Sequence, residues 1–148
     1  MLRKIIESDR ELFLQYMNEF YDSDAVVDPI NPKNFETTFK FIVKGDPYVD
    51  GYMIEFDNET VGYLILSITY SNEVGGYVTW LEELYISDKY QGKGYGEQTM
   101  KDINETLKDT TRAFRLEVSP ENEAITNFYK RHGFETRTYL QMYHPNKK

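Results

Sequence analysis

The sequence contains no cysteine and only two histidines, His132 and His144. The absence of cysteine excludes disulfide bonds, thiolate zinc sites and a cysteine nucleophile. Two histidines give little support to any other metal site, so we expect no metal. No segment approaches the ~20 apolar residues of a membrane span, and the first residues lack the apolar run of a signal peptide. We therefore expect a cytoplasmic protein without a membrane partner, and we assign it to a bacterium.

Basic residues are fewer than acidic ones: the chain has 17 Lys and Arg and 25 Asp and Glu, which gives a net charge of −8. An acidic surface repels phosphate backbones, so we expect no nucleic-acid partner, whereas cationic ligands are attracted. The 148 residues correspond to one domain, which we assign to residues 1–148. Hydrophobic residues make up 40% of the chain, enough for a core despite a mean hydropathy of −0.64.

The periodicity of apolar residues changes along the chain and predicts an α+β domain. Apolar stripes at helical spacing predict helices that include residues 12–20, 35–43, 100–107 and 125–132. Alternation and turn signals predict strands over residues 2–6, 48–56, 61–70, 77–86, 114–118 and 134–143. We therefore expect a mixed, mostly antiparallel sheet of about six strands flanked by four helices.

A glycine-rich loop, Gln91-Gly92-Lys93-Gly94-Tyr95-Gly96, stands between a predicted strand and a predicted helix. Glycines allow several backbone N–H groups to turn towards one point, and the helix N-terminus adds to their positive potential. Such a loop suits a phosphate or pyrophosphate. It does not fit a P-loop, and its third glycine comes one position too early for a dinucleotide fingerprint. Taken alone, the loop is also compatible with a turn that only caps a helix.

A second motif follows, because residues 122–134 contain Asn122, an aromatic–tyrosine pair ending at Tyr129, basic residues, and then Gly133-Phe134. The loop, with Gln91, Gly94 and Gly96 at the defining positions, resembles the acyl-CoA loop of the GNAT (general-control-related) N-acetyltransferase superfamily. Residues 122–134 resemble the second motif of that family. The resemblance covers residues 61–134 well, whereas residues 1–60 match only in pattern. It implies a single GNAT-like domain in which a central pair of parallel strands splays apart around acetyl-CoA.

The resemblance also implies which residues bind acetyl-CoA, the only cosubstrate we expect. The pantetheine arm would bind backbone groups of one strand and the side chain of a helix cap, namely Leu84, Tyr85, Ile86 and Asn122. The Ile86 N–H would donate to the thioester carbonyl as an oxyanion hole. The pyrophosphate would bind the loop residues Gln91, Gly92, Lys93, Gly94, Tyr95 and Gly96.

Acetyl transfer to an amine needs a base, because a primary amine with a pKa near ~10 arrives protonated. Glu82 and Glu83 lie on the strand that leads to the loop, and strand alternation predicts that they point to opposite faces. A likeness to polyamine and diamine acetyltransferases favours Glu82 as the base, with Glu83 as the alternative. Tyr129 matches the family's tyrosine that protonates the leaving thiolate, although its helical stripe is also typical of core packing. Since no cysteine is present, we expect direct transfer without an acyl-enzyme.

The sequence therefore predicts an acetyl-CoA-dependent N-acetyltransferase. Phe20 and Tyr21 precede a loop that contains Asp22, Asp24 and Asp28, and this mixture favours a small cationic acceptor such as a polyamine or an aminoglycoside. The alternatives are a protein or peptide amine, or a sensor domain that binds acyl-CoA without turnover. Retention of Glu82 and Tyr129 favours the enzyme. By analogy with the family, the chain can also form a homodimer.

Overall fold

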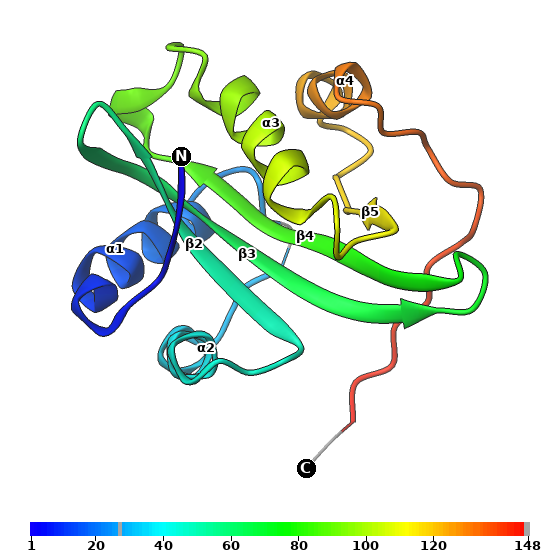
Figure 1. The fold of residues 1–148 in the computed structure, drawn as a ribbon, viewed down its shortest axis with the longest axis horizontal. Coiled ribbons are helices and arrows are strands. Elements are labelled where there is room, and N and C mark those ends of the chain that lie inside the picture. Colours follow the sequence, from blue (N-terminus) through cyan, green and yellow to red (C-terminus); the bar gives the residue numbers. More distant parts are fainter. Residues whose placement is uncertain (27, 147–148) are drawn as a thin grey trace.

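The computed structural model describes residues 1–26 and 28–146 and contains one mixed sheet (Figure 1). The strands follow in spatial order as β1 (Leu2–Lys4), β2 (Val49–Phe56), β3 (Glu59–Ser71), β4 (Gly76–Ile86) and β5 (Ala113–Arg115). Neighbours pair antiparallel up to β4, and β4 pairs with β5 in parallel. The predicted α+β class is confirmed, with five strands in place of about six.

Four helices cover the two faces of this sheet (Figure 1). They are α1 (Arg10–Tyr21), α2 (Lys33–Lys44), α3 (Tyr95–Leu107) and α4 (Glu123–Arg131), and short 3-10 turns η1 (Glu7–Asp9) and η2 (Asp88–Tyr90) precede α1 and α3. Alternation along β3 separates two cores. Tyr63 and Ile65 pack against α1 and α2, whereas Leu64 and Leu66 pack on the α3 side. None of the helices in the described ranges is both long and apolar enough to cross a membrane.

The parallel pair β4 and β5 separates early, as the resemblance implied. Only Val78–Trp80 pair with Ala113–Arg115, although β4 continues to Ile86. Beyond Trp80, no strand of the described chain pairs with the outer edge of β4. This separation leaves free backbone groups on β4 close to the glycine-rich loop.

The predicted strand over residues 134–143 is wrong, because the described chain after α4 forms no ladder. The three-residue β5 offers few backbone groups to a further strand, and alternation produces a strand only where an open edge receives it. Side-chain hydrogen bonds attach this segment to the rest of the fold. Arg137 donates to Glu73 at 3.1 Å, and Gln141 donates to Glu117 at 2.8 Å. Four of its apolar or aromatic side chains, Tyr139, Leu140, Met142 and Tyr143, are 74–89% exposed.

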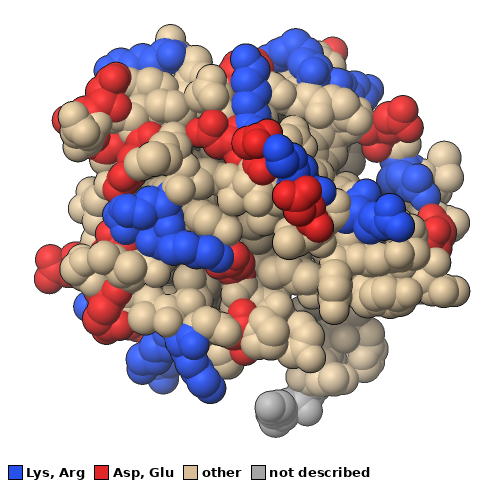
Figure 2. Space-filling view, in the orientation of Figure 1, with Lys and Arg blue, Asp and Glu red and all other residues tan. Residues whose placement is uncertain are grey.

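Charges of both signs are interspersed over the face of the molecule in Figure 2. Charged side chains also form pairs, such as Arg3 with Asp9 at 2.9 Å and with Glu55 at 2.5 Å. These two pairs are partly buried, whereas the exposed pairs elsewhere contribute little stability each. The fold therefore depends mainly on the two apolar cores.

Gly62 on β3 allows β4 to approach closely near the end of β4, at Tyr85. A Cβ at Gly62 would lie 1.9 Å from the Tyr85 carbonyl oxygen, which belongs to the backbone. We expect Gly62→Ala to destabilise the chain by at least about 1–3 kcal/mol, because the ladder must shift. Urea unfolding measures this change. Gly96→Ala is the matched control, since its Cβ would meet Phe128 at an ordinary 3.6 Å; a Gly62→Ala chain with the wild-type urea midpoint would contradict the expectation.

Candidate active site

A β-bulge in β4 places two carboxylates on one face of the sheet. Ile65 pairs with Glu83 and Leu66 with Leu81, so Glu82 is the extra residue. The Glu82 Oε1 accepts a hydrogen bond of 2.5 Å from Ser67 Oγ, and Ser67 shares its β3 face with Ile65 because side chains alternate. The expectation that Glu82 and Glu83 point to opposite faces is therefore wrong, since the bulge cancels the alternation between them.

Glu83 is held by two phenols beneath the end of α1. Its Oε1 accepts a hydrogen bond of 2.7 Å from Tyr63 Oη, and its Oε2 accepts one of 3.2 Å from Tyr21 Oη. Burial raises the pKa of Glu83 above its ordinary value, the two phenols oppose this rise, and the nearby Glu82 charge adds to it. Within residues 1–26 and 28–146, no cationic group lies within 4.0 Å of either carboxylate. The pair is thus a partly buried acidic site without a counter-ion.

Glu82 differs from Glu83 in its accessibility. Glu82 is exposed, and only its Oε1 has a hydrogen-bond partner among the described residues. Both oxygens of Glu83 already accept from phenols. An incoming ammonium therefore finds a free carboxylate oxygen on Glu82.

A cleft of about 380 Å³ lies where β4 ends. It is lined from β4 by Leu84, Tyr85 and Ile86, from the loop and α3 by Gln91, Gly92, Gly94, Tyr95 and Gly96, and from α4 by Tyr129. The structure thus brings together most of the residues predicted to bind acetyl-CoA, and the predicted acid. Lys93, Asn122, Glu82 and Glu83 are outside this lining.

The ladder with β3 determines which N–H groups of β4 face the cleft. Ser87 N–H donates to the Val61 carbonyl at 2.8 Å, and Gly62 is opposite Ile86. Because bonded and non-bonded positions alternate in an antiparallel ladder, the Ile86 N–H points away from β3, towards the free edge. The Gln91 side chain donates to the Ile86 carbonyl at 2.9 Å and thereby ties the loop to the end of the strand.

The loop forms a cradle of backbone N–H groups. Gly92 and Gly94 have φ values of 74° and 81°, and a Cβ at either position would meet nothing within 4 Å. Gly94 is the N-cap of α3 and supplies no side-chain cap, so the first N–H groups of the helix remain available. This arrangement fits an anionic group such as a pyrophosphate. Lys93 Nζ lies 5.6 Å from the centre of the Tyr90 ring, beside the loop.

Tyr129 is packed among aromatic side chains and also lines the cleft. The centre of its ring lies 5.1 Å from that of Phe128 and 5.6 Å from that of Phe134. Burial raises the pKa of Tyr129 to about 12, so the phenol keeps its proton at neutral pH. Asn122 caps α4, as predicted, by accepting from the Ile125 N–H at 3.1 Å.

Several residues of the site were not assigned from the sequence, and Phe20 was assigned only to the acceptor side. Phe20, Ser23 and Ala25 bring the end of α1 and its following loop to the cleft, and Tyr90, Ile125 and Phe128 complete its wall. Tyr63, fully buried, holds Glu83. Alternation along β3 predicts that Tyr63 and Ile65 share one face of the sheet. It does not predict that Glu83 lies beside them, because that depends on the register of β4 at the bulge.

Comparison with known proteins identifies relatives of this chain. The sequence model of the acetyltransferase (GNAT) family matches residues 10–134. An uncharacterised N-acetyltransferase of Methanocaldococcus jannaschii is 30% identical over 106 residues, which cover 70% of this chain and 46% of that protein. The thialysine N-epsilon-acetyltransferase of Sus scrofa is 31% identical over 85 residues, 57% of this chain and 49% of that protein. The chain spans about half the length of these curated relatives.

Solved structures share the fold at low sequence identity. A possible acetyltransferase from Clostridium difficile 630 has a TM-score of 0.84 and 13% identity, with 100% of this chain and 98% of that chain covered. The structure of AAC(6')-Iy in complex with a bisubstrate analogue has a TM-score of 0.78 and 16% identity, with 99% and 98% covered. These likenesses extend the shared fold over the N-terminal helices.

Burial of Glu83 predicts a stability that depends on pH. Its folded-state pKa lies above its ordinary value of 4.5, so the native state binds more protons, and stability falls as the pH rises through that range. We expect Glu83→Gln to raise the Tm at pH 7–8 by a few degrees and to lose this advantage near pH 4. Thermal unfolding across this pH range measures the effect, with Glu121→Gln, at an exposed position away from the pair, as control. A constant Tm difference at all pH values would contradict it.

Proposed function

Because the chain belongs to the acetyltransferase (GNAT) family, we propose that it transfers the acetyl group of acetyl-CoA directly to an amine. One observation carries this proposal. The free edge of β4, the glycine-rich loop and Tyr129 meet in a single cleft, and the carboxylates Glu82 and Glu83 directly precede the cleft-lining Leu84 on β4. A phosphate-binding module without acyl transfer would need neither Tyr129 nor the carboxylates.

Acetyl-CoA binding follows from backbone groups at the end of β4 and in the loop. The pyrophosphate accepts from N–H groups of residues 91–96 at the start of α3, and Lys93 adds a positive charge beside them. The pantetheine lies along Leu84, Tyr85 and Ile86, with Asn122 at the start of α4 as a further contact. The Ile86 N–H, which points away from β3, donates to the thioester carbonyl and stabilises the negative charge that develops on its oxygen.

The attacking amine must first lose a proton. We assign this step to Glu82, because it is exposed and has a free oxygen, with Glu83 as the second negative charge that holds the ammonium. The deprotonated nitrogen attacks the carbonyl carbon, a C–N bond forms, and the C–S bond breaks as the tetrahedral intermediate collapses. The nitrogen releases its second proton, and the leaving sulfur becomes a thiol.

Tyr129 is the proposed donor to that sulfur. Its pKa of about 12 lies above the ~8.5 of an ordinary thiol, so the phenol first stabilises the developing thiolate by a hydrogen bond. It passes on its proton as the nitrogen releases one, and the overall reaction yields an amide, CoA thiol and one proton. A role of this kind contributes typically about 100-fold or more to the rate.

A cationic acceptor matches the charge of the site. Glu82 and Glu83 have no counter-ion among the described residues, and an ammonium group supplies one. The names of a relative, a thialysine N-epsilon-acetyltransferase, and of a structural neighbour, the aminoglycoside N-acetyltransferase AAC(6')-Iy, agree with small amines. We therefore favour a small polycation such as a polyamine or an aminoglycoside over a protein amine. A homodimer of this single domain remains a prediction.

The direct test is release of CoA thiol from acetyl-CoA across a panel of polyamines, aminoglycosides, amino acids and basic peptides. The chain has no cysteine, so it adds no thiol background. We expect release that depends on one class of amine and that falls about 100-fold or more in kcat in Tyr129→Phe, with CoA affinity unchanged. CoA binding without release for any amine would instead support a sensor domain.

The assignment of the base predicts different effects at two adjacent carboxylates. We expect Glu82→Gln to lower kcat about 100-fold at neutral pH and to recover activity as the pH approaches the amine pKa of ~10. Glu83→Gln is the matched control, and we expect a smaller loss because both of its oxygens already accept from phenols. A larger loss at Glu83 would transfer the role of base to that residue.

A further inference from the structure

The glycine-rich loop and the first turn of α3 are fastened to three parts of the fold. The first attachment is the hydrogen bond from the Gln91 side chain to the Ile86 carbonyl at the end of β4. Glu97 pairs with Arg131 at 2.9 Å and with His132 at 2.5 Å, near the C-terminus of α4. The third attachment is Tyr95, which contacts the turn between β2 and β3. That turn has no place in the reaction described above.

Tyr95 makes two different contacts with this turn. Its ring stacks on Phe56, with the ring centres 4.3 Å apart and the planes 5° from parallel. Its Oη donates a hydrogen bond of 3.0 Å to Asp57 Oδ2. Stacking fixes the plane of the ring and the hydrogen bond fixes its direction, so together they restrict the side chain of the first residue of α3.

The turn between β2 and β3 is tight and well defined by its backbone. Asp57 and Asn58 have φ values of 52° and 63°, the only positive values at non-glycine positions in the described chain. Two successive residues with positive φ are typical of the tight type I′ hairpin turn, which favours Asn and Asp. The ladder closes directly beside it, where Phe56 pairs with Glu59. The position of Phe56 is therefore fixed by the sheet.

The loop needs such a support because its own backbone is permissive. Gly92 and Gly94 have positive φ values and open surroundings, and glycine has more conformational freedom to lose than any other residue. An anion site made of backbone N–H groups binds tightly only if those groups already point at the ligand, because ordering them on binding costs affinity.

We infer that Phe56 and Asp57 are positioning residues for the acyl-CoA site: through Tyr95 they hold the N–H groups at the start of α3 in the direction that a pyrophosphate requires. This inference rests on the proposed function. Of these three residues, Tyr95 lines the cleft, whereas Phe56 and Asp57 lie behind it. The hairpin turn at one end of the sheet thus determines affinity for the donor and leaves the acceptor side unaffected.

The test measures the Kd of CoA by calorimetry, together with the Tm of each unliganded chain. We expect Phe56→Leu to weaken CoA binding about tenfold, a change worth about 1.4 kcal/mol, while kcat at saturating acetyl-CoA and the KM of the acceptor stay within about twofold. Phe56→Tyr keeps the stacked ring and should restore affinity. Tyr95→Phe keeps the stack and removes only the hydrogen bond, so we expect a loss of about two- to threefold. This variant also tests the inference if Phe56→Leu fails to fold.

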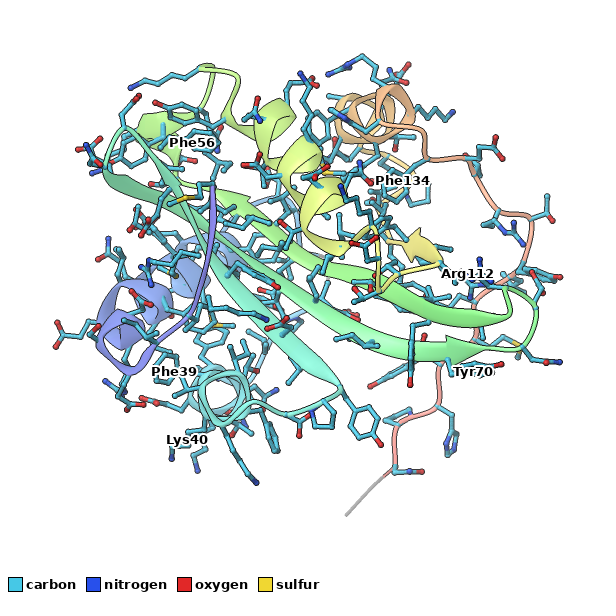
Figure 3. All side chains as sticks on the ribbon, viewed as in Figure 1. Phe39, Lys40, Phe56, Tyr70, Arg112 and Phe134 are labelled. Carbon is cyan, nitrogen blue, oxygen red and sulfur yellow. The ribbon has the colours of Figure 1, made fainter. Side chains whose placement is uncertain are left out.

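Tyr77→Leu is the matched control. Tyr70 and Tyr77 form an exposed aromatic pair on the hairpin between β3 and β4, with ring centres 6.2 Å apart, and Figure 3 shows Phe56 and Tyr70 at opposite ends of the sheet. We expect this control to bind CoA like the wild type. Equal CoA affinity in wild type, Phe56→Leu and Tyr95→Phe would overturn the inference alone, as would parallel losses in kcat and acceptor KM. A wild-type chain that does not bind CoA would overturn the proposed function as well.

Discussion

The antiparallel ladder between β3 and β4 is the constraint on which the candidate site depends. It uses the N–H groups of alternate β4 residues and leaves the others, including that of Ile86, directed to the free edge. Gly62 lets the two backbones approach at Tyr85, and the bulge at Glu82 turns two acidic side chains towards α1. Because β5 leaves β4 after Trp80, the free N–H groups are not taken up by another strand.

The carboxylate pair shows a local conflict between stability and function. Burying Glu83 disfavours its charged form, and two phenols compensate only in part, since its pKa remains above the ordinary value. A chain optimised for stability alone would place an apolar residue among Tyr21, Tyr63 and Ile65. A carboxylate without a counter-ion is instead suited to receive one from a ligand.

Much of the site could be predicted from local sequence because its parts are local. The loop 91–96 contains its own glycines. Asn122 caps α4, which begins at the next residue, and Tyr129 lies on that same helix. Each of these features depends on residues within a few positions along the chain. The structure confirms the cap at Asn122, and it places the loop and Tyr129 around one cleft.

The sequence by itself determined the α+β class, the glycine-rich loop and the helix cap at Asn122, since periodicity, glycine spacing and capping chemistry are properties of short segments. The family resemblance added the candidate residues for acetyl-CoA binding and proton transfer. Only the tertiary structure decided where Glu82 and Glu83 point, because a bulge is defined by the register with a partner strand. It also decided that residues 134–143 form no strand beside the short β5, and that Phe56 reaches Tyr95. These outcomes depend on contacts between segments that are distant along the chain, which no local pattern encodes.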